Sequence, residues 1–349
     1  MKVGLFDHVD RSDRPFATQL DERLTFVQAA DEAGLWCYHV AEHHASPLNM
    51  VPVPGAYMGA VARLTKRIRI GPLVYLLPLY SPLRLAEEIC MLDHMSRGRM
   101  EIGVGRGVSP FELKFHKIDH EQSREIFVDA YECLNAALTQ DVFSYSGKHY
   151  TYENVPMPLR PLQKPFPAFW YGSSNATGSD WAGERGLHFA TNGPITRAKA
   201  NLDVYREALA KAGGKVAQPK AEFKGGAAMG VSRQIIVADT DEEAIRIAKP
   251  AVEHFHRNLT YLVREHAVKN DVSMRLQVPA ASTFEEQLKE GTVIAGSPST
   301  VLAEIERQTE ILGINYLISY LFFGTMQLSD ALRSLQLFSQ EVMPKLERL

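Results

Sequence analysis

Short apolar runs alternate with longer amphipathic segments along most of this chain of 349 residues. A run such as KVGLF (2–6) has the length and the apolar content of a strand buried on both faces. The longer segments repeat apolar residues at helical spacing. Ser81 and Pro82 are typical of a helix start, and Gly34 is typical of a helix end. The pattern predicts a chain in which strands and helices alternate.

The strands and helices follow one another in a single register. Strands are expected at 2–6, 35–44, 68–76, 99–105, 166–172, 186–191, 233–239 and 314–324. Helices are expected at 23–34, 52–66, 81–96, 123–138, 196–212, 240–256, 299–312 and 329–348. No linker-like or low-complexity stretch divides the chain. We therefore predict one α/β domain over residues 1–349, a (β/α)8 barrel of the TIM type with insertions, and not a pair of Rossmann domains.

Two segments interrupt the alternation. Residues 139–165 are rich in Tyr and Pro and contain FSYSGKHYTYENV, which predicts an inserted hairpin. The region 250–298 has only weak periodicity, and loops of such length in compact domains are usually functional lids or lack structure. We expect a mobile lid at about 265–292.

Composition narrows the class of protein. A hydrophobic fraction of 45% and a charged fraction of 23% are those of a soluble globular enzyme. The net charge of -3 and the lack of any long basic run argue against a nucleic-acid partner. The start, MKVGLFDHVD, has no long apolar core, and no window has the length of a membrane span. Cys37, Cys90 and Cys133 lie far apart, which predicts free thiols in a cytoplasmic protein.

The carboxyl ends of the strands are where (β/α)8 barrels carry out their chemistry. Strand 2–6 is followed by Asp7 and His8, and strand 35–44 ends in VAEHH. The next three strand ends bring Leu73 and Val74, then Gly105 and Arg106, then Ser173 and Ser174. All of these residues are expected around one mouth.

A phosphate-binding cup is the first candidate site in this mouth. GVGRG (103–107) is not a dinucleotide fingerprint, because the third glycine would fall on Val108; by itself it could be a plain tight turn. GSSNATGS (172–179) precedes a helix, and its hydroxyls suit either an anion or ordinary capping. Arg124 opens a helix against the helix dipole, a conflict that a bound anion or a salt bridge would remove. Taken together, these features predict a cup made by Arg106, Arg124, Ser173, Ser174 and Thr177.

Three interpretations are open for Glu42, His43 and His44. They could bind a metal with His8 as a third ligand, although no HExxH motif is present. They could be histidines satisfied by neighbours at the barrel rim, or one histidine could act as a general acid and base. Strand alternation sends Glu42 and His44 to one side and His43 to the other, unless the strand has already ended.

A further pair, Ser109 and Glu112 in SPFE, has the spacing of a helix capping box. We therefore interpret both residues as structural and not as catalytic.

The chain resembles the bacterial luciferase-like flavin monooxygenases over nearly its whole length. The resemblance rests on VAEHH, on RIRIGPLVYLLPLYSPLRLAEEICMLDHMSRGRMEIGVGRG, on QSRE (122–125), on VADTDEEA (237–244) and on EVMPKL. It implies a barrel that binds reduced FMN, supplied by a separate NAD(P)H-dependent flavin reductase. With O2, such an enzyme oxygenates a small apolar organic substrate. The family's phosphate contacts fall on Arg106, Arg124, Ser173 or Ser174, and Thr177.

The resemblance also implies roles around the flavin ring. The family's catalytic histidine falls on His43, and we expect Glu42 and His44 to orient it. A non-prolyl cis peptide bond is expected at Leu73–Val74, beside the ring. Gly105 stands where luciferase proper has a cysteine, which argues against a light-emitting enzyme.

Other functions stay open on the same barrel. They are an F420- or flavin-dependent oxidoreductase that transfers hydride, a metal-dependent hydrolase centred on His8, His43 and His44, and a flavin-binding subunit without activity. A homodimer is expected through helices 56–64 and 82–95. A mouth lined by apolar side chains would suit an aldehyde, a ketone or a terpene-like substrate; the residues expected there are Phe6, Tyr75, Trp170 and Phe323.

Overall fold

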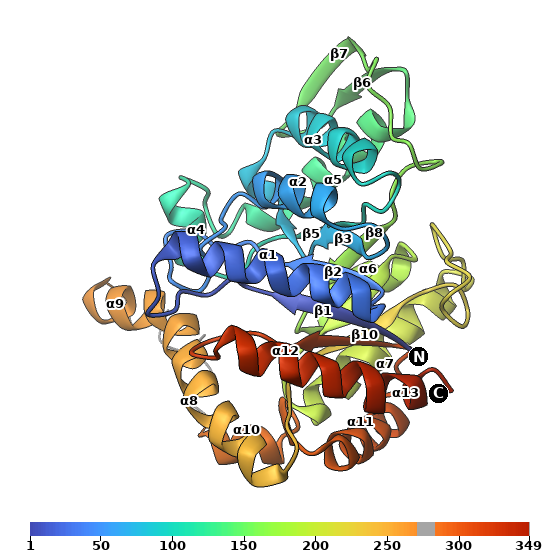
Figure 1. The fold of residues 1–349 in the computed structure, drawn as a ribbon. Coiled ribbons are helices and arrows are strands. Elements are labelled where there is room, and N and C mark those ends of the chain that lie inside the picture. Colours follow the sequence, from blue (N-terminus) through green and yellow to red (C-terminus); the bar gives the residue numbers. More distant parts are fainter. Residues whose placement is uncertain (271–282, 349) are drawn as a thin grey trace.

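A nearly closed barrel of parallel strands forms the centre of the protein, with helices packed around it (Figure 1). The structure, a computed structural model, describes residues 1–270 and 283–348. Within these residues the strand order is β3-β2-β1-β12-β10-β9-β8-β5-β4, and β11 pairs with β10 outside this path. The barrel strands are β1 (Lys2–Asp7), β2 (Cys37–Val40), β3 (Arg69–Pro72), β4 (Tyr75–Leu76), β5 (Ile102–Gly105), β8 (Phe169–Gly172), β9 (His188–Thr191), β10 (Met229–Val237) and β12 (Tyr316–Tyr320).

The barrel closes at the third predicted strand, which is interrupted. Its first half, β3, pairs with β2, and its second half, β4, pairs with β5. A parallel bridge between Ile70 and Met100 joins the first half to the chain just before β5. The interruption contains the Leu73–Val74 peptide bond, which is cis as predicted. Counted as one interrupted strand, β3 and β4 give the expected barrel, so the predicted fold class is confirmed.

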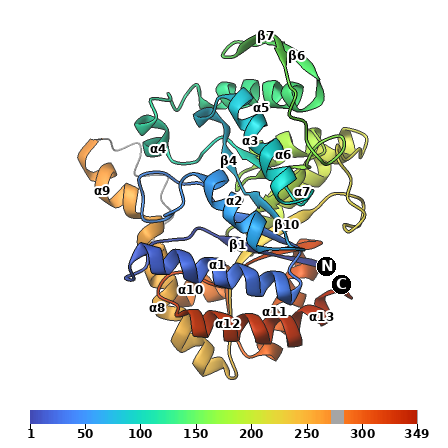
Figure 2. The ribbon, with the colours of Figure 1, turned by 45° about the horizontal axis from the view of Figure 1, so that its top comes forward.

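Helices cover the outside of this barrel, as Figure 2 also shows. They are α1 (Phe16–Ala33), α2 (Pro54–Leu64), α3 (Pro82–Met95), α4 (Pro110–Phe115), α5 (Ser123–Thr139), α6 (Ala176–Glu184), α7 (Ile195–Lys211), α8 (Asp241–Leu259), α9 (Tyr261–Asn270), α10 (Phe284–Lys289), α11 (Pro298–Leu312), α12 (Leu328–Leu337) and α13 (Met343–Leu346).

Several predicted elements differ from the structure. Helix α1 begins at Phe16, whereas its predicted start is residue 23. Strand β11 (Val293–Gly296) pairs in parallel with β10, although no strand was expected in 250–298. Only four residues long, it is too short to show a period of its own. The single helix predicted at 329–348 is instead α12, a π-helical turn (Phe338–Val342) and α13. Pro344 lies in this last part and has no backbone N–H to continue an α-helix.

The predicted insertion contains an antiparallel hairpin, β6 (Val142–Ser146) and β7 (Thr151–Pro156), which projects from the barrel at the top of Figure 1. Asp129 of α5 anchors it, since its carboxylate accepts hydrogen bonds from Tyr145 Oη at 2.6 Å and from the His149 backbone N–H at 2.6 Å. Of the predicted lid, residues 271–282 lie outside the described residues; α9 and α10 flank them.

Side chains on the two faces of the strands form separate hydrophobic clusters. The inner cluster fills the barrel and includes Phe6, Ala41, Trp170 and Tyr316. The outer cluster lies between the strands and the helices. Because successive strand residues alternate between the two faces, this division decides which side chains at the strand ends point over the barrel axis.

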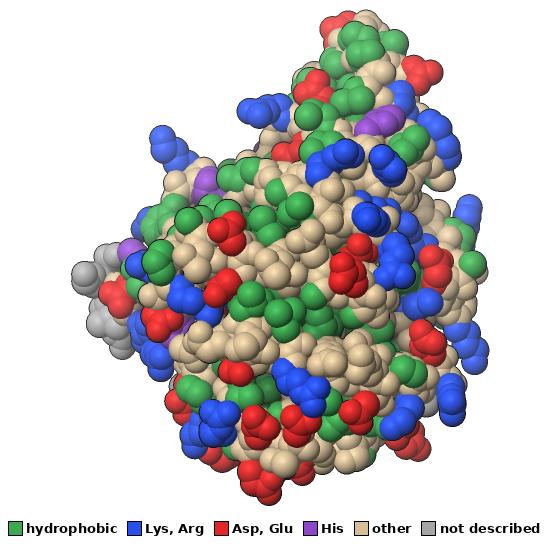
Figure 3. Space-filling view, in the orientation of Figure 1, with side chains coloured by type: hydrophobic (Ala, Val, Ile, Leu, Met, Phe, Trp, Pro, Cys, Tyr) green, Lys and Arg blue, Asp and Glu red, His purple; other side chains and the backbone are tan. Residues whose placement is uncertain are grey.

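The two ends of the chain meet at one side of the barrel, where the Met1 amino group donates to the Leu346 carbonyl at 2.8 Å (Figures 1 and 2). On the face seen in Figure 3, basic and acidic side chains are mixed. Among the described residues, no helix has the length and the apolar character needed to cross a membrane.

Candidate active site

His43 is the histidine of VAEHH that faces the barrel axis. On β2, His39 bonds the inner Tyr316 hydroxyl at 2.8 Å, and Ala41 belongs to the inner cluster. His43 continues this alternation two residues further on. Its ring stacks on that of His8, with the centroids 5.5 Å apart and an interplanar angle of 17°.

Glu112, on α4, holds the His43 ring in place. His43 Nδ1 lies 3.0 Å from Glu112 Oε1, and Glu112 Oε2 accepts from the His44 backbone N–H at 3.1 Å. Glu112 is 4% exposed, so its carboxylate is shielded from water, while the His43 side chain is partly exposed. A carboxylate can only accept, so the proton lies on His43 Nδ1 and leaves Nε2 for other partners. This is the arrangement of an oriented general acid and base.

The expected capping box is therefore only half present. Ser109 Oγ accepts from the Glu112 backbone N–H at 3.3 Å and caps α4. The Glu112 carboxylate, however, turns to His43 and not back to the Ser109 N–H. The S-x-x-E spacing fits a full capping box and also a helix cap whose Glu reaches another side chain. Nothing in the sequence distinguishes these two cases.

Glu42 and His44 do not orient His43, contrary to the expectation. Glu42 Oε1 bonds His44 Nε2 at 2.8 Å. Glu42 Oε2 accepts from the Leu76 N–H and from Tyr80 Oη, both at 3.0 Å. The 3%-exposed Glu42 carboxylate thus braces the backbone that follows the cis peptide bond.

Leu73, Val74 and Gly105 lie together at this edge of the mouth, beside Gly172. A Cβ built on Gly105 would lie 2.4 Å from Val74 Cγ2, and one on Gly172 would lie 3.3 Å from Val74 Cγ1. The Val74 side chain therefore packs on the two glycine backbones. At Gly105 a larger residue would require the Val74 side chain to move.

Arg106 and Arg124 converge on the end of β8. Burial raises the pKa of Tyr171, and the nearby cations of Arg124 and Arg106 oppose that rise. Neither arginine forms an ion pair or a hydrogen bond with another described residue through its guanidinium. Two unpaired guanidinium groups at one place are suited to an anion.

The N-terminus of α6 borders the same place. A Cβ on Gly178, in its first turn, would lie 3.0 Å from Tyr171 Cε1. Asn175 caps the helix, since its side chain accepts from the Gly178 N–H at 3.0 Å, and Ser173 Oγ donates to the Asn175 carbonyl at 3.2 Å. Thr177 is exposed. Asn175 was missed among the hydroxyls, although asparagine is a leading cap residue.

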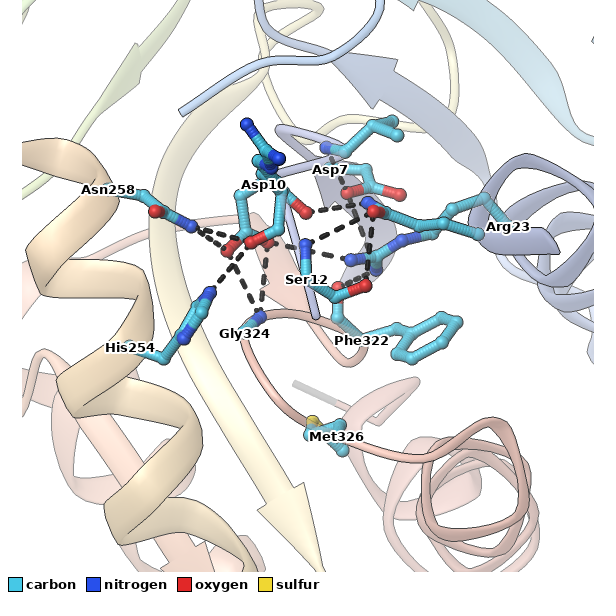
Figure 4. A network of polar contacts seen from close by, with 12 residues as sticks. Asp7, Asp10, Ser12, Arg23, His254, Asn258, Phe322, Gly324 and Met326 are labelled. Carbon is cyan, nitrogen blue, oxygen red and sulfur yellow. Dashed lines mark hydrogen bonds and ion pairs between the residues drawn. The ribbon is translucent and has the colours of Figure 1, made fainter. Parts of the chain in front are cut away.

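A buried ionic network fixes the position of the end of β1 (Figure 4). Arg23 of α1, with a fully buried side chain, lies 3.6 Å from Asp7 Oδ1 and 3.5 Å from Asp10 Oδ1. Asp10 also accepts from Asn258 Nδ2 of α8 at 3.1 Å and from the Gly324 N–H after β12. Burial raises the pKa of Asp7 to about 6, although the Arg23 cation opposes this.

The open alternative of a metal site centred on His8, His43 and His44 does not fit this geometry. His44 turns to Glu42, so it does not join His8 and His43; among the described residues no cluster of three or more His, Cys, Asp or Glu could hold a metal ion. Of the apolar residues expected around the mouth, Phe6 does lie beside His8, at 5.2 Å between centroids.

The three other aromatic residues expected at the mouth lie elsewhere. Tyr75 donates to Glu88 at 2.8 Å in the outer cluster. Trp170 is fully buried inside the barrel and donates to Glu101 at 2.7 Å. Phe323 also belongs to the outer cluster. Side-chain direction at these positions depends on strand bounds that the apolar pattern leaves open by a residue or two.

Comparison with known proteins gives the same fold and a family. The family model described as luciferase-like monooxygenase matches residues 1–315. An uncharacterised protein of Sinorhizobium fredii, y4wF, is 34% identical over 99% of this chain and 97% of its own. Limonene 1,2-monooxygenase of Rhodococcus erythropolis is 26% identical over 97% of this chain and 84% of its own.

Solved structures agree on the barrel. The oxygenating constituent of 3,6-diketocamphane monooxygenase from Pseudomonas putida, solved with FMN, matches with a TM-score of 0.79 and 24% identity over 99% of this chain and 98% of its own. An F420-dependent secondary alcohol dehydrogenase matches with a TM-score of 0.74 and 18% identity over 99% and 98%. At these identities the likeness shows the fold alone.

Proposed function

The chain belongs to the luciferase-like monooxygenase family, and on that premise we propose that it oxygenates a small apolar organic molecule with O2 and reduced FMN. One observation carries the proposal: the carboxylate-held His43 faces the barrel axis at the same barrel end as Arg106 and Arg124, whose guanidinium groups pair with no residue in the described part of the chain. Such a site combines a proton-transfer group with an anion-binding group. Relatives named as acting on limonene and on diketocamphane support an apolar substrate.

The residues present fit FMN. Arg106, Arg124 and the α6 N-terminus offer charge and backbone N–H groups to a phosphate. Leu73, Val74 and Gly105 offer an uncharged surface for the ring. When bound in reduced form, FMN would supply the electrons that activate O2.

In this proposal the protein contributes proton transfer and positioning. His43 Nε2 moves a proton at the reacting oxygen, and the Glu112 carboxylate stabilises the imidazolium that forms. Glu42 keeps the backbone after the cis bond in place through the Leu76 N–H. The apolar surroundings of Phe6 and Leu73 exclude water from the mouth.

We also propose the partners. A separate NAD(P)H-dependent flavin reductase would supply the flavin, as the phrase "oxygenating constituent" suggests for the Pseudomonas protein. A homodimer through α2 and α3 is supported by Leu64 and Met91, which are 42% and 54% exposed. The three buried free cysteines support a cytoplasmic location.

Flavin binding tests the cup. Arg106→Ala and Arg124→Ala should each weaken FMN binding about tenfold or more, because each removes a charge-assisted contact to the phosphate. Arg246→Ala removes an equal charge from the outside of α8, where Arg246 is 71% exposed, and should leave the FMN dissociation constant unchanged. Equal constants in all three variants would remove the cup from the proposal. Parallel titration with F420 tests the hydride-transfer alternative.

Turnover tests His43. In His43→Ala, substrate oxygenation should fall by about 10²–10⁴, the usual contribution of a general acid and base, while FMN binding changes little. Unchanged coupled turnover would contradict the assignment.

A further inference from the structure

His8 occupies the centre of the aromatic layer beside His43. Its ring stacks between His43 and Tyr320, at 5.5 Å from each and with angles of 17° and 19°. The edge of Phe255 closes a further side at 5.2 Å. His8 is only 9% exposed, so the ring is enclosed by the site and not by solvent.

No residue that the structure describes bonds to the ring nitrogens of His8, and only Nε2 is open to a ligand. Nδ1 is inaccessible and makes no hydrogen bond. Neither nitrogen bonds to any other residue that the structure describes. Buried polar groups in folded proteins are almost always hydrogen-bonded. Because Nδ1 is closed off, Nε2 is the nitrogen of His8 that a ligand atom beside the reaction site would pair with.

The backbone around His8 is held in a strained conformation. Val9 has φ 49°, a genuine outlier for a β-branched residue. The Val9 N–H donates to Asp7 Oδ1 at 2.6 Å, and Arg23 holds that carboxylate from the other side. Such strain persists only where surrounding contacts impose it, and it clusters at functional positions. Here the network of Figure 4 imposes it on the residue that follows His8.

The His8 imidazole is also neutral. Burial lowers the pKa of His8 well below its ordinary value, and the nearby His43 and Arg23 lower it further. A neutral ring does not attract a carboxylate but can donate one N–H. Tyr320, its stacking neighbour, bonds Ser232. A carbonyl oxygen needs only a donor, whereas a hydroxyl would need an acceptor as well.

We propose that His8 binds the organic substrate, donating a hydrogen bond from Nε2 to a carbonyl oxygen. His8 thereby selects uncharged ketones and aldehydes over hydrocarbons of the same shape. The inference rests on the proposed monooxygenase function, and it adds a substrate-binding residue and a substrate class to it.

Matched ligand pairs test the role of His8. The probes are cyclic and bicyclic ketones, such as cyclohexanone and camphor, and their parent hydrocarbons, titrated into FMN-loaded protein and, by calorimetry, into flavin-free protein. The wild type should bind at least one ketone about 3- to 10-fold more tightly than its hydrocarbon. His8→Phe should lose this preference. His8→Gln should restore it, because its amide places an N–H near Nε2, whereas His8→Asn reaches only the closed-off position of Nδ1 and should not.

Infrared spectra add a readout that a purely structural role would not change. With a ¹³C=O-labelled ketone, the bound carbonyl stretch should lie at lower frequency in the wild type and return to its value in apolar solvent in His8→Phe. Thermal melting and FMN affinity identify any variant that fails to fold.

The outcomes separate the two proposals. A ketone preference and carbonyl frequency that are equal in the wild type and in His8→Phe overturn the role of His8, even where FMN binding and oxygenation are intact. A wild type that prefers no ketone of the panel overturns it as well. A wild type that does not bind FMN overturns the proposed function, while calorimetry on the flavin-free protein still decides on His8.

Discussion

At the scale of single residues, the site depends on one carboxylate, Glu112, which joins α4 to the segment that follows β2. Glu112 bonds His43 Nδ1 and the His44 N–H, so it fixes both the ring and the backbone that carries it. Its α4 neighbour Ser109 caps the helix and has no part in this contact. The two residues of SPFE therefore have separable roles.

Glu112→Gln should reduce turnover at least tenfold. The loss should approach about 10²-fold, the smallest contribution usual for a general acid and base. The amide can no longer stabilise a protonated His43, and it can donate to Nδ1 and select the other tautomer. Steady-state oxygenation, with FMN affinity measured beside it, checks this.

Ser109→Ala is the matched control for Glu112→Gln. It should cost about 1 kcal/mol of unfolding free energy through loss of the cap and leave turnover unchanged. Equal turnover losses in the two variants would mean that only the position of α4 matters.

At the scale of elements, helix ends and strand ends do the positioning. Asn175 caps α6 beside Tyr171 and the two arginines, and Thr240 caps α8 after β10. Both cap side chains accept a backbone N–H three residues on. Only the α6 end borders the proposed phosphate cup.

Asn175→Ala and Thr240→Ala should each lower the unfolding free energy by about 1 kcal/mol. Asn175→Ala should in addition weaken FMN binding several-fold, because the first turn of α6 frays where the phosphate would bind. Denaturant unfolding and FMN titration of both variants check this. Equal FMN affinity in the two variants would exclude the α6 end from the cup.

The β1 end depends on α1 through Arg23. Arg23→Met should cost about 3–5 kcal/mol of unfolding free energy at neutral pH, because it leaves Asp7 and Asp10 as buried carboxylates without their cation. The loss should shrink at pH 5, where the two carboxyls protonate more easily. Urea unfolding at both pH values measures it. Arg246→Ala, on the outer face of α8, serves as the control, and a loss that does not depend on pH would contradict the explanation.

At the scale of the whole molecule, the barrel interior is a mixed apolar and polar layer. His39 and His188 lie inside it, and burial lowers the pKa of each to about 4. An unfolded histidine titrates near 6.5. Between about pH 6.5 and pH 4 the unfolded chain therefore binds protons that the native chain does not. This contribution to stability is complete above pH 6.5 and is lost as the pH falls toward 4.

His39→Gln should make the acid loss of stability shallower. The slope of unfolding free energy against pH should decrease by up to about 1.4 kcal/mol per pH unit between pH 6 and 4.5. Gln keeps a polar contact to the Tyr316 hydroxyl and limits the damage to packing. Urea unfolding of both proteins over this range measures the slopes, and identical slopes would disprove the role of His39.

The sequence by itself determined the barrel, most of its strands and some of the residues at its mouth. Apolar periodicity and turn chemistry are local properties, so they predicted a third strand at 68–76, the VAEHH end and the arginine pair. That this strand is interrupted did not follow from the pattern; the cis bond inside it was expected only from the family resemblance. The local patterns did not resolve β11, whose four residues are too few to show a period. They also left the exact ends of the strands undetermined. The directions in which the Tyr75 and Phe323 side chains point were therefore undetermined as well.

Only the tertiary structure decided the chemistry of the site. It turned His43 to the axis, gave it Glu112 as partner from 69 residues away, and turned Glu42 to His44 and to the Leu76 N–H. It enclosed His8 between two rings and gave its nitrogens no partner among the residues that the structure describes. These contacts join residues that are distant in the chain and depend on small shifts of strand register and helix rotation, which local patterns do not encode.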